Sequence, residues 1–317
     1  MEKMRMERIF VLGASMVALA LVTTSCGSTG GPSSSSPGPI ASKMTLGGPP
    51  ECPTRPFCEA GLTSKYGLHF KAFKALDAGG PLTKSALDRG DIDIGLIFSS
   101  DSAYSTGKYV QLEDDKHLQN ADNVVPVIKT AKANADVTAL LNEIDGKLTT
   151  QDLISLNKSA DVDKQDPDVI AKKWLMDHSY ATSASGASKG TLNIGALNFP
   201  ESAIIAQIYG QALKGKGYTV NFKLNLGSRE VVEPALERGD IDLFPDYAAT
   251  ELEFQNKGKG EATPDATATV AKLNTYLGPK NLKALDASPA VDQNAFAVLK
   301  SGKYGKYTKL SDLAGTA

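Results

Sequence analysis

A segment of 21 residues occurs twice in this chain, at a fixed spacing of 149 positions. Residues 73–93 read FKALDAGGPLTKSALDRGDID, and residues 222–242 read FKLNLGSREVVEPALERGDID. Each copy predicts a strand, a glycine-containing turn, a short helix and a second strand, with Gly90 and Gly239 where a helix end needs positive φ. Two such units in one chain predict two related α/β lobes.

The second strand of each copy is expected to end beside a binding site. Residues 91–98 and 240–244 turn apolar, as strands that enter a covered sheet do. In open α/β sheets the carboxyl ends of the strands face the binding crevice. Residues 98–101 and 245–247 are therefore expected at corresponding rims of a cleft. The Arg-Gly-Asp tripeptides end a helix and open a strand, which argues against their display on a loop for cell adhesion.

Length and charge agree with two lobes and exclude some partners. The chain has 317 residues, about twice the length of a typical single domain, so two sizeable cores are expected. It carries 34 Lys plus Arg against 36 Asp plus Glu, a formal net charge of −2. So small a net charge gives no long-range attraction for nucleic acid, which favours a clearly basic face.

Residues 1–25 have the organisation of a signal peptide. Basic residues precede the apolar run 9–22, which is short for a spanning helix, and Thr-Thr-Ser leads into Cys26. This resembles a bacterial lipobox, with Thr23 where an aliphatic residue is usual. Residues 26–41 then read as a flexible tether. We expect export and lipid anchoring through Cys26 to the outer face of the bacterial cell membrane; an ordinary cleaved signal peptide or a short uncleaved anchor are the alternatives.

Two further cysteines, Cys52 and Cys58, stand in ECPTRPFC. An exported protein meets an oxidising compartment, and the two prolines between the cysteines favour a tight loop. We expect a local disulfide, with two free thiols as the alternative. The three histidines, His69, His117 and His178, have no metal-ligand spacing, and we expect no metal and no cofactor.

The rest of the chain reads as alternating strands and helices. Strands are predicted at 191–197 and 218–224, with an amphipathic helix at 201–214 between them. A further helix at 169–177 follows Asp166-Pro167, with Asp166 as its N-cap and Trp174 in the core. Residues 181–190, ATSASGASKG, are small and polar and read as a linker.

These residues resemble a known family. Residues 192–317, with LNIGALNFPES, GSREVVEPALERGDIDLFPDYAATEL and SPAVDQNAFAVLK, are similar to the first half of the glycine betaine/choline-type (quaternary ammonium compound) substrate-binding lipoproteins of ABC importers. Residues 44–178, with MTLGGPPEC, LTKSALDRGDIDIGLIFSSD and LNEIDGKLTTQDLISLN, are similar to the second half. The resemblance implies a type II periplasmic-binding-protein-like α/β fold, whose two lobes are mixed sheets flanked by helices with a cleft between them.

The halves stand in the reverse of the family's usual order, which looks like a circular permutation. The linker 181–190 would join the usual ends, an arrangement that folds when those ends lie close together. Because the family's lobes are joined by crossing strands, new termini inside one lobe make the other lobe continuous. We therefore expect a continuous lobe at 106–295 and a split lobe made of 43–105 plus 296–317.

The resemblance also implies ligand-binding residues. A quaternary ammonium group cannot donate N–H hydrogen bonds and is best held by aromatic faces with a carboxylate nearby. Matching the family position by position gives Asn198, Phe199, Asp246, Tyr247, Asn294, Phe296, Phe98, Asp101 and Asp122. Phe98 and Phe296 each stand where the family usually has a tyrosine, and Asp122 stands where relatives often have a further tyrosine. These substitutions leave room for a ligand with hydroxyl or amine donors, which an aspartate can accept.

Other readings of these residues stay open. Without the resemblance, the three phenylalanines in or beside apolar strands would be assigned to the core, and Asp246 to a turn. Arg229, after Gly227-Ser228 at a helix start, is either a clamp for a ligand carboxylate or one partner of a surface ion pair.

The leading hypothesis is a monomeric, lipid-anchored solute-binding protein for osmoprotection. It would close two lobes over a small cationic or zwitterionic osmolyte, glycine betaine, choline or a relative, and deliver it to an ABC permease. A surface lipoprotein that uses the same scaffold as a sensor or interaction module is the second hypothesis. An enzyme on this scaffold is the third, and it is disfavoured because the sequence displays no catalytic set.

Overall fold

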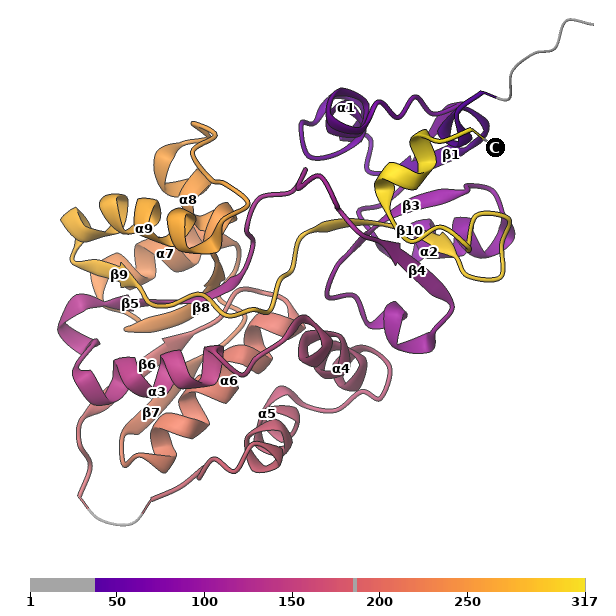
Figure 1. Cartoon of the computed structure of the whole chain (residues 1–317). Helices are drawn as coiled ribbons and strands as arrows, with labels where there is room; N and C mark the ends of the chain where they lie inside the picture. Colours follow the sequence, from indigo (N-terminus) through magenta and orange to yellow (C-terminus); the bar gives the residue numbers. More distant parts are fainter. Residues whose placement is uncertain (1–37, 185–186, 317) are drawn as a thin grey trace, which may run out of the picture. The chain divides into compact units, whose positions relative to one another are not determined.

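The protein is described here by a computed structural model of residues 38–184 and 187–316. The expected signal peptide, Cys26 and most of the expected tether lie outside the described residues. Strands of the described part form two five-stranded sheets, and helices cover both (Figure 1). The expected α/β fold, with two lobes that each hold a mixed sheet flanked by helices, is confirmed.

The first sheet has the strand order β2-β1-β3-β10-β4. Its strands are β1 (Thr45–Gly48), β2 (Ala72–Ala75), β3 (Ile94–Phe98), β4 (Tyr109–Leu112) and β10 (Asn294–Leu299). Its helices are α1 (Glu59–Gly61), a π-helical turn at Leu62–Tyr66, α2 (Pro81–Arg89), and 3₁₀ turns at Ile40–Lys43, Cys52–Thr54, Ser102–Thr106 and Leu310–Ala314.

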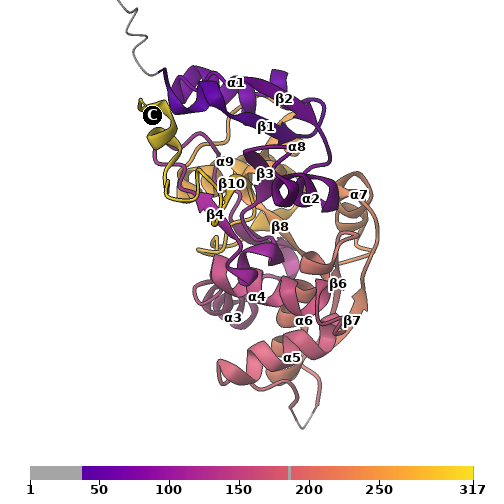
Figure 2. The same ribbon diagram turned by 90° about the vertical axis from the view of Figure 1, so that its right-hand side faces the viewer.

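The second sheet has the order β7-β6-β8-β5-β9. Its strands are β5 (Val124–Lys129), β6 (Thr191–Gly195), β7 (Thr219–Lys223), β8 (Leu243–Tyr247) and β9 (Leu282–Ala284). Its helices are α3 (Ala135–Asp145), α4 (Thr150–Asp161), α5 (Pro167–Asp177), α6 (Pro200–Gly215), α7 (Arg229–Arg238), α8 (Ala248–Asn256) and α9 (Ala266–Leu277), with 3₁₀ turns at Thr130–Lys132 and Gly278–Lys280. Helix α5 lies beside α6 (Figure 2).

Both sheets follow one plan. In each, three parallel strands are followed by a strand that enters from the other lobe and runs antiparallel, β10 in the first sheet and β5 in the second. The chain crosses between the sheets twice, from β4 to β5 and from β9 to β10 (Figure 1). An antiparallel bridge between Asn123 and Val291 joins the two crossing segments.

The apolar side chains of the second sheet alternate between two cores, as strand geometry requires. Val124 and Ile128 of β5 pack with α3, α4, α5 and α6, whereas Val125 and Val127 pack with α7, α8 and α9. Trp174 lies in the first of these cores and is 4% exposed, which confirms its expected place. Both faces of the sheet are therefore covered by helices.

The repeated segment folds in the same way in both lobes. Gly90 and Gly239 end α2 and α7 with φ of 73° and 83°, as the sequence predicted. In each copy the last aspartate, Asp93 or Asp242, accepts a hydrogen bond of 2.8 Å from a backbone N–H of a strand in its own lobe, β1 or β6. A Cβ on Gly47 of β1 would lie 2.5 Å from the side chain of Ile92, and a Cβ on Gly195 of β6 would lie 2.5 Å from that of Ile241.

The expected lobe boundary at residues 105 and 106 is wrong. Strand β4 (Tyr109–Leu112), assigned to the continuous lobe, pairs with β10 in the first sheet. The chain crosses to the second sheet only before β5 at Val124, because the apolar Tyr109 and Leu112 complete the first lobe's cores. The return crossing comes at Asn294, close to the expected position.

The expected tether also extends too far along the chain. Ile40 and Ala41, placed in the tether, are 3% and 0% exposed and belong to the core of the first lobe. The backbone N–H of Ile40 donates to the carbonyl of Gly315, so both ends of the described chain lie side by side. The side chain of Ile40 is buried because apolar partners surround it in the fold, although its neighbours in the sequence are small or polar.

Two smaller expectations concern helix ends and linkers. Asp166 stands at the N-cap position of α5, but its side chain makes no capping hydrogen bond, which differs from the expected role. Residues 181–184 and 187–190 form no helix or strand, in agreement with a linker. Among the described residues, none of the helices has the length and apolar character needed to cross a membrane.

Candidate functional site

A cavity of about 550 Å³ lies where the two lobes and the two crossing segments meet. The first lobe contributes Phe57 and Phe98, and the crossing segments contribute Gln119, Asn120, Asp122, Asp292, Gln293 and Asn294. The second lobe contributes Leu197, Asn198, Phe199, Ser228, Arg229, Tyr247, Ala249, Thr250 and Glu253. The lining therefore combines four aromatic rings with carboxylates and amides.

The aromatic residues come from loops and strand ends. Phe98 is the last residue of β3 and Tyr247 the last of β8, so the strand rule correctly placed both at one cleft. The rings of Phe199 and Tyr247 stack with centroids 6.2 Å apart. Phe57 and Phe98 of the first lobe are 39% and 36% exposed, an unusual state for so large an apolar side chain.

A buried hydrogen-bond network holds Tyr247. Its hydroxyl donates to Glu201 at 2.5 Å, and the amide of Asn157 in α4 donates to the other oxygen of Glu201, also at 2.5 Å. The same amide donates to the carbonyl of Ser100 at 2.9 Å, and the Ser100 hydroxyl donates to Asp292 at 2.8 Å. Asn157 belongs to the second lobe and Ser100 to the first, so this network links the lobes behind the cavity.

Arg229 lies between the cavity and two buried carboxylates. Its guanidinium makes a two-point contact with Asp246, with an Nε–Oδ2 distance of 2.8 Å, and lies 3.0 Å from Glu251. Burial opposes its positive charge, but Asp246 and Glu251 outweigh that effect and raise the pKa of Arg229. Burial also raises the pKa of Glu251 well above its ordinary value.

The carboxyl groups of the cavity lining itself belong to Asp122, Glu253 and Asp292. Asp122 accepts hydrogen bonds of 2.7 Å from the backbone N–H and the hydroxyl of Thr250, and burial raises its pKa to about 6. Burial also raises the pKa of Asp292 well above its ordinary value. Among the described residues that line the cavity, Arg229 is the single cation, and buried Asp246 already pairs with it. Burial thus favours the neutral form of Asp122 and Asp292, and a cation placed beside these carboxyl groups would favour their ionised form.

The structure brings seven of the ten residues expected to bind ligand into one cavity lining: Asn198, Phe199, Arg229, Tyr247, Asn294, Phe98 and Asp122. For Arg229 the sequence left two interpretations open: a clamp for a ligand carboxylate, or one partner of a surface ion pair. Its side chain is only 14% exposed and its ion pair is buried, so the surface ion pair is wrong.

Three expected residues lie away from the cavity wall. Asp246 is fully buried behind Arg229. Phe296 is 1% exposed in the core of the first lobe, because it shares a face of β10 with Val298. Asp101 accepts from the backbone N–H of Ala103 at 2.7 Å and pairs with Lys84 at 2.7 Å. Asp101 instead lines a neighbouring pocket, which shares Phe98, Phe199 and Asp292 with the cavity.

Sequence reasoning missed Phe57, Gln119, Thr250, Glu253 and Asp292 among the lining residues. Asp292 stands two positions before the expected Asn294, and Thr250 three after the expected Tyr247, so proximity was a signal for both. Phe57 gave no signal beyond its place next to Cys58, with which Cys52 forms a disulfide in the structure. Within the described part of the chain, no cluster of His, Cys, Asp and Glu side chains is arranged to hold a metal ion.

Comparison with known proteins identifies a family. Residues 36–177 and 190–317 match the model of the family described as the substrate binding domain of ABC-type glycine betaine transport systems. The chain belongs to this family. Its members are substrate-binding components of importers, and the unmatched stretch 178–189 covers most of the linker.

Two curated relatives are similar over part of their length. The carnitine transport binding protein OpuCC of Listeria monocytogenes is 25% identical over 117 residues, which is 36% of this chain and 37% of the relative. A glycine-betaine-binding protein of Pseudomonas aeruginosa is 26% identical over 146 residues, 45% of this chain and 46% of the relative. The matches thus span less than half of each relative.

Solved structures offer more distant likenesses. The L-cystine solute receptor of Neisseria gonorrhoeae in its unliganded open conformation is 11% identical, with 87% of this chain and 86% of that chain covered and a TM-score of 0.43. Substrate binding domain 2 of Lactococcus lactis GlnP in its open conformation is 11% identical, with 88% of each chain covered and a TM-score of 0.42. Likenesses this distant carry no information about the ligand.

Proposed function

We propose that this protein captures glycine betaine, choline or a related quaternary ammonium osmolyte outside the cytoplasm and delivers it to an ABC permease for osmoprotection. The observation that carries the proposal is the composition of the cavity wall. Phe57, Phe98, Phe199 and Tyr247 surround a space that also receives the carboxylates of Asp122 and Asp292. A methylated ammonium spreads its charge over an apolar surface, which aromatic faces attract by about 0.5–2 kcal/mol each.

Residues of both lobes would contact the ligand. Phe199 and Tyr247 form a stacked pair on the second lobe, and Phe98 stands on the opposite rim. Because the cavity is larger than a small osmolyte needs, closure of the lobes would add the first lobe's rings to a ligand already held by the second. A ligand that contacts both lobes stabilises the closed state by those additional contacts.

A zwitterionic ligand would need a partner for its carboxylate. Arg229 uses its Nε and one terminal nitrogen on Asp246, which leaves its other terminal nitrogen for a guest. The amides of Gln119, Asn198 and Asn294 also line the cavity. The site thus suits a positively charged head with a hydroxyl or a carboxylate on its other end.

We further propose that the chain is a circular permutation of its family and is held at the membrane by lipid on Cys26. The permutation is supported by two separate family matches with the linker between them, and by the close approach of Ile40 to Gly315. Lipid attachment rests on the sequence around Cys26 alone. Metabolic labelling with a fatty acid, compared between the chain and its Cys26→Ala variant, tests the anchor.

Calorimetry on the full-length chain tests the proposed ligand class. Choline, glycine betaine, proline betaine and carnitine should each be titrated, and we expect at least one to bind. The matched control is 3,3-dimethylbutan-1-ol, which has the shape of choline without its charge and should bind at least tenfold more weakly. Binding of none of the four cations would favour a sensor or interaction role, and turnover of any of them would favour an enzyme.

A further inference from the structure

The loop between Cys52 and Cys58 delivers an aromatic ring to the cavity. This disulfide loop, residues 52–58, holds the only two cysteines of the described part of the chain, both almost fully buried at 0% and 1% exposure. Phe57, the residue before Cys58, is 39% exposed and lines the cavity. The loop therefore turns its sulfur atoms inward and its aromatic ring toward the site.

We propose that Phe57 contacts the ligand and that the Cys52–Cys58 disulfide is the device that positions it. The inference rests on the proposed function, because it assigns a wall of the same cavity. The ring of Phe57 is absent from the apolar cores of the described residues, whereas both cysteines belong to the first lobe's core. An exposed phenylalanine next to a buried, cross-linked neighbour serves the cavity rather than the core.

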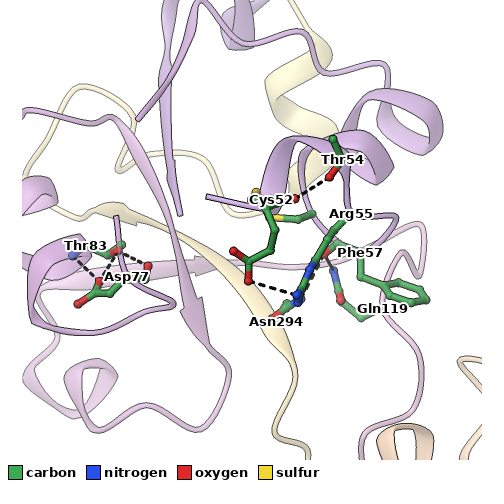
Figure 3. The surroundings of a disulfide bond; sticks show 10 residues. Cys52, Thr54, Arg55, Phe57, Asp77, Thr83, Gln119 and Asn294 are labelled. Atoms are coloured by element: carbon green, nitrogen blue, oxygen red, sulfur yellow. Dashed lines mark hydrogen bonds and ion pairs between the residues drawn. A yellow bond between two sulfur atoms is a disulfide. The ribbon is translucent and has the colours of Figure 1, made fainter. Parts of the chain in front are cut away.

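Two side-chain amides fix the backbone of Phe57 to the site. Its carbonyl accepts hydrogen bonds from Gln119 at 3.1 Å and from Asn294 at 3.4 Å (Figure 3). Gln119 precedes β5 and Asn294 begins β10, so each belongs to one of the crossing segments, and both line the cavity. The loop is thus attached to both segments that cross between the lobes.

Close packing of α1 fixes the other side of the loop. A Cβ on Gly61 would lie 1.8 Å from the carbonyl oxygen of Pro56 and 2.6 Å from Leu118. The carbonyl of Cys58 also accepts from the backbone N–H of Leu62 at 2.9 Å. With a disulfide across its ends and a helix against its backbone, the loop presents Phe57 in one place before the ligand arrives. Such preorganisation raises affinity because less is lost in ordering the side chain.

The first experiment measures the choline and glycine betaine affinities of full-length variants by calorimetry. Phe57→Leu keeps an apolar side chain but removes the ring, and we expect affinity to fall about three- to tenfold, the range of one cation–π contact. Phe57→Tyr restores a ring and should stay within about twofold of the unmodified chain. Phe70→Leu, the same change at a half-buried position outside the cavity lining, is the matched control and should leave affinity unchanged.

The second experiment separates positioning from general stability. The double variant Cys52→Ala/Cys58→Ala should lose a similar three- to tenfold in affinity while its circular dichroism stays native. Adding Phe57→Leu to this double variant should then cost little more, because the two changes act on one contact and are not additive. Gly61→Ala, which displaces the loop without touching the cysteines or Phe57, should also weaken binding.

The outcomes are distinguishable. Equal affinities for Phe57→Leu and Phe70→Leu would overturn the contact of Phe57 with the ligand. Full additivity of the cysteine and Phe57 changes would overturn the positioning role of the disulfide. Failure of the unmodified chain to bind any quaternary ammonium compound would instead contradict the proposed function, and the ligand contact with it.

Discussion

The two copies of the repeated segment share a backbone plan but differ in charge. The spacing of 149 makes Phe98 and Tyr247 equivalent, and both line the cavity. One position earlier, the strand after the first copy has Ile97, which packs in an apolar core, and the strand after the second copy has Asp246, which is fully buried against Arg229. An apolar side chain in one lobe is thus replaced by half of an ion pair in the other.

Two positions inside the repeated segment differ in charge as well. Arg229 stands where the first copy has Gly80, and Glu233 where it has Lys84. Burial raises the pKa of Glu233 to about 7 and that of Glu251 well above its usual value. Burial therefore favours the neutral form of both carboxyl groups. One backbone plan thus accommodates a buried ion pair with neighbouring carboxyl groups in the second lobe and an apolar core at the equivalent position of the first.

The largest expected effect tests the buried ion pair. Arg229→Met removes the cation that faces Asp246 and Glu251, both fully buried, and should lower the free energy of unfolding by about 3 kcal/mol. The matched change in the first lobe is Lys84→Met, which breaks a pair with Asp101 whose side chains are 27% and 15% exposed, and should cost under about 1 kcal/mol. Urea unfolding measures both. Equal losses would remove the distinction between the lobes.

The next effect compares the two equivalent aromatic residues. Tyr247→Ala should weaken choline binding at least tenfold, because Phe199 and Glu201 hold this ring in place before the ligand arrives. Phe98→Ala should cost only about threefold, because this ring is 36% exposed. Calorimetric titrations would show the order. A greater loss for Phe98→Ala would make the first lobe the main binding surface, and unchanged affinity in Tyr247→Ala would remove that residue from the site.

A smaller effect concerns pH. The raised pKa of Asp122, about 6, leaves the group largely neutral at pH 5 and largely ionised at pH 7. Choline affinity should therefore rise with pH across this window, by about fivefold, the strength of one water-screened charge attraction. Titrations at pH 5, 6 and 7 measure this rise, and Asp122→Asn should flatten it. A rise that persists in Asp122→Asn would assign the pH dependence to another group, with Asp292 the next to test.

The smallest expected effect concerns the link between the lobes. Asn157→Ala removes the hydrogen bonds that join Glu201 to the first lobe through the Ser100 carbonyl, and should weaken choline binding about threefold. Asn142→Ala in α3, which loses a hydrogen bond to Asp286 away from the cavity, is the matched control. Both affinities can be read from the same calorimetric series. If the two variants bind choline equally, the contact between the lobes does not support Tyr247.

Much of the fold could be predicted because its signals are local. Apolar periodicity placed α6, which spans Pro200–Gly215 against the expected 201–214, and glycines marked the ends of α2 and α7. The lobe boundary was wrong because β4 is a short strand whose partner, β10, follows it by almost two hundred residues. No local pattern reveals a pairing at that separation.

The candidate site divides in the same way. Phe98 and Tyr247 could be placed because strand ends in an α/β sheet share one edge, and Phe199 because of the family resemblance. Asp246 could not be recognised as buried, because its partner Arg229 lies 17 positions away on α7. Phe57 could not be found, since a side chain beside a cysteine points inward or outward according to the packing of the loop.

By itself, the sequence determined two related α/β units, the glycine-ended helices of each, the pair of cysteines and the aromatic rims, because propensity and periodicity act between near neighbours. Tertiary structure alone decided which of the expected residues line the cavity. It buried Asp246 and Phe296, paired Asp101 with Lys84, and brought Phe57 to the cavity. Burial and ion pairing depend on what the rest of the chain places nearby, and distant segments meet only in the folded state.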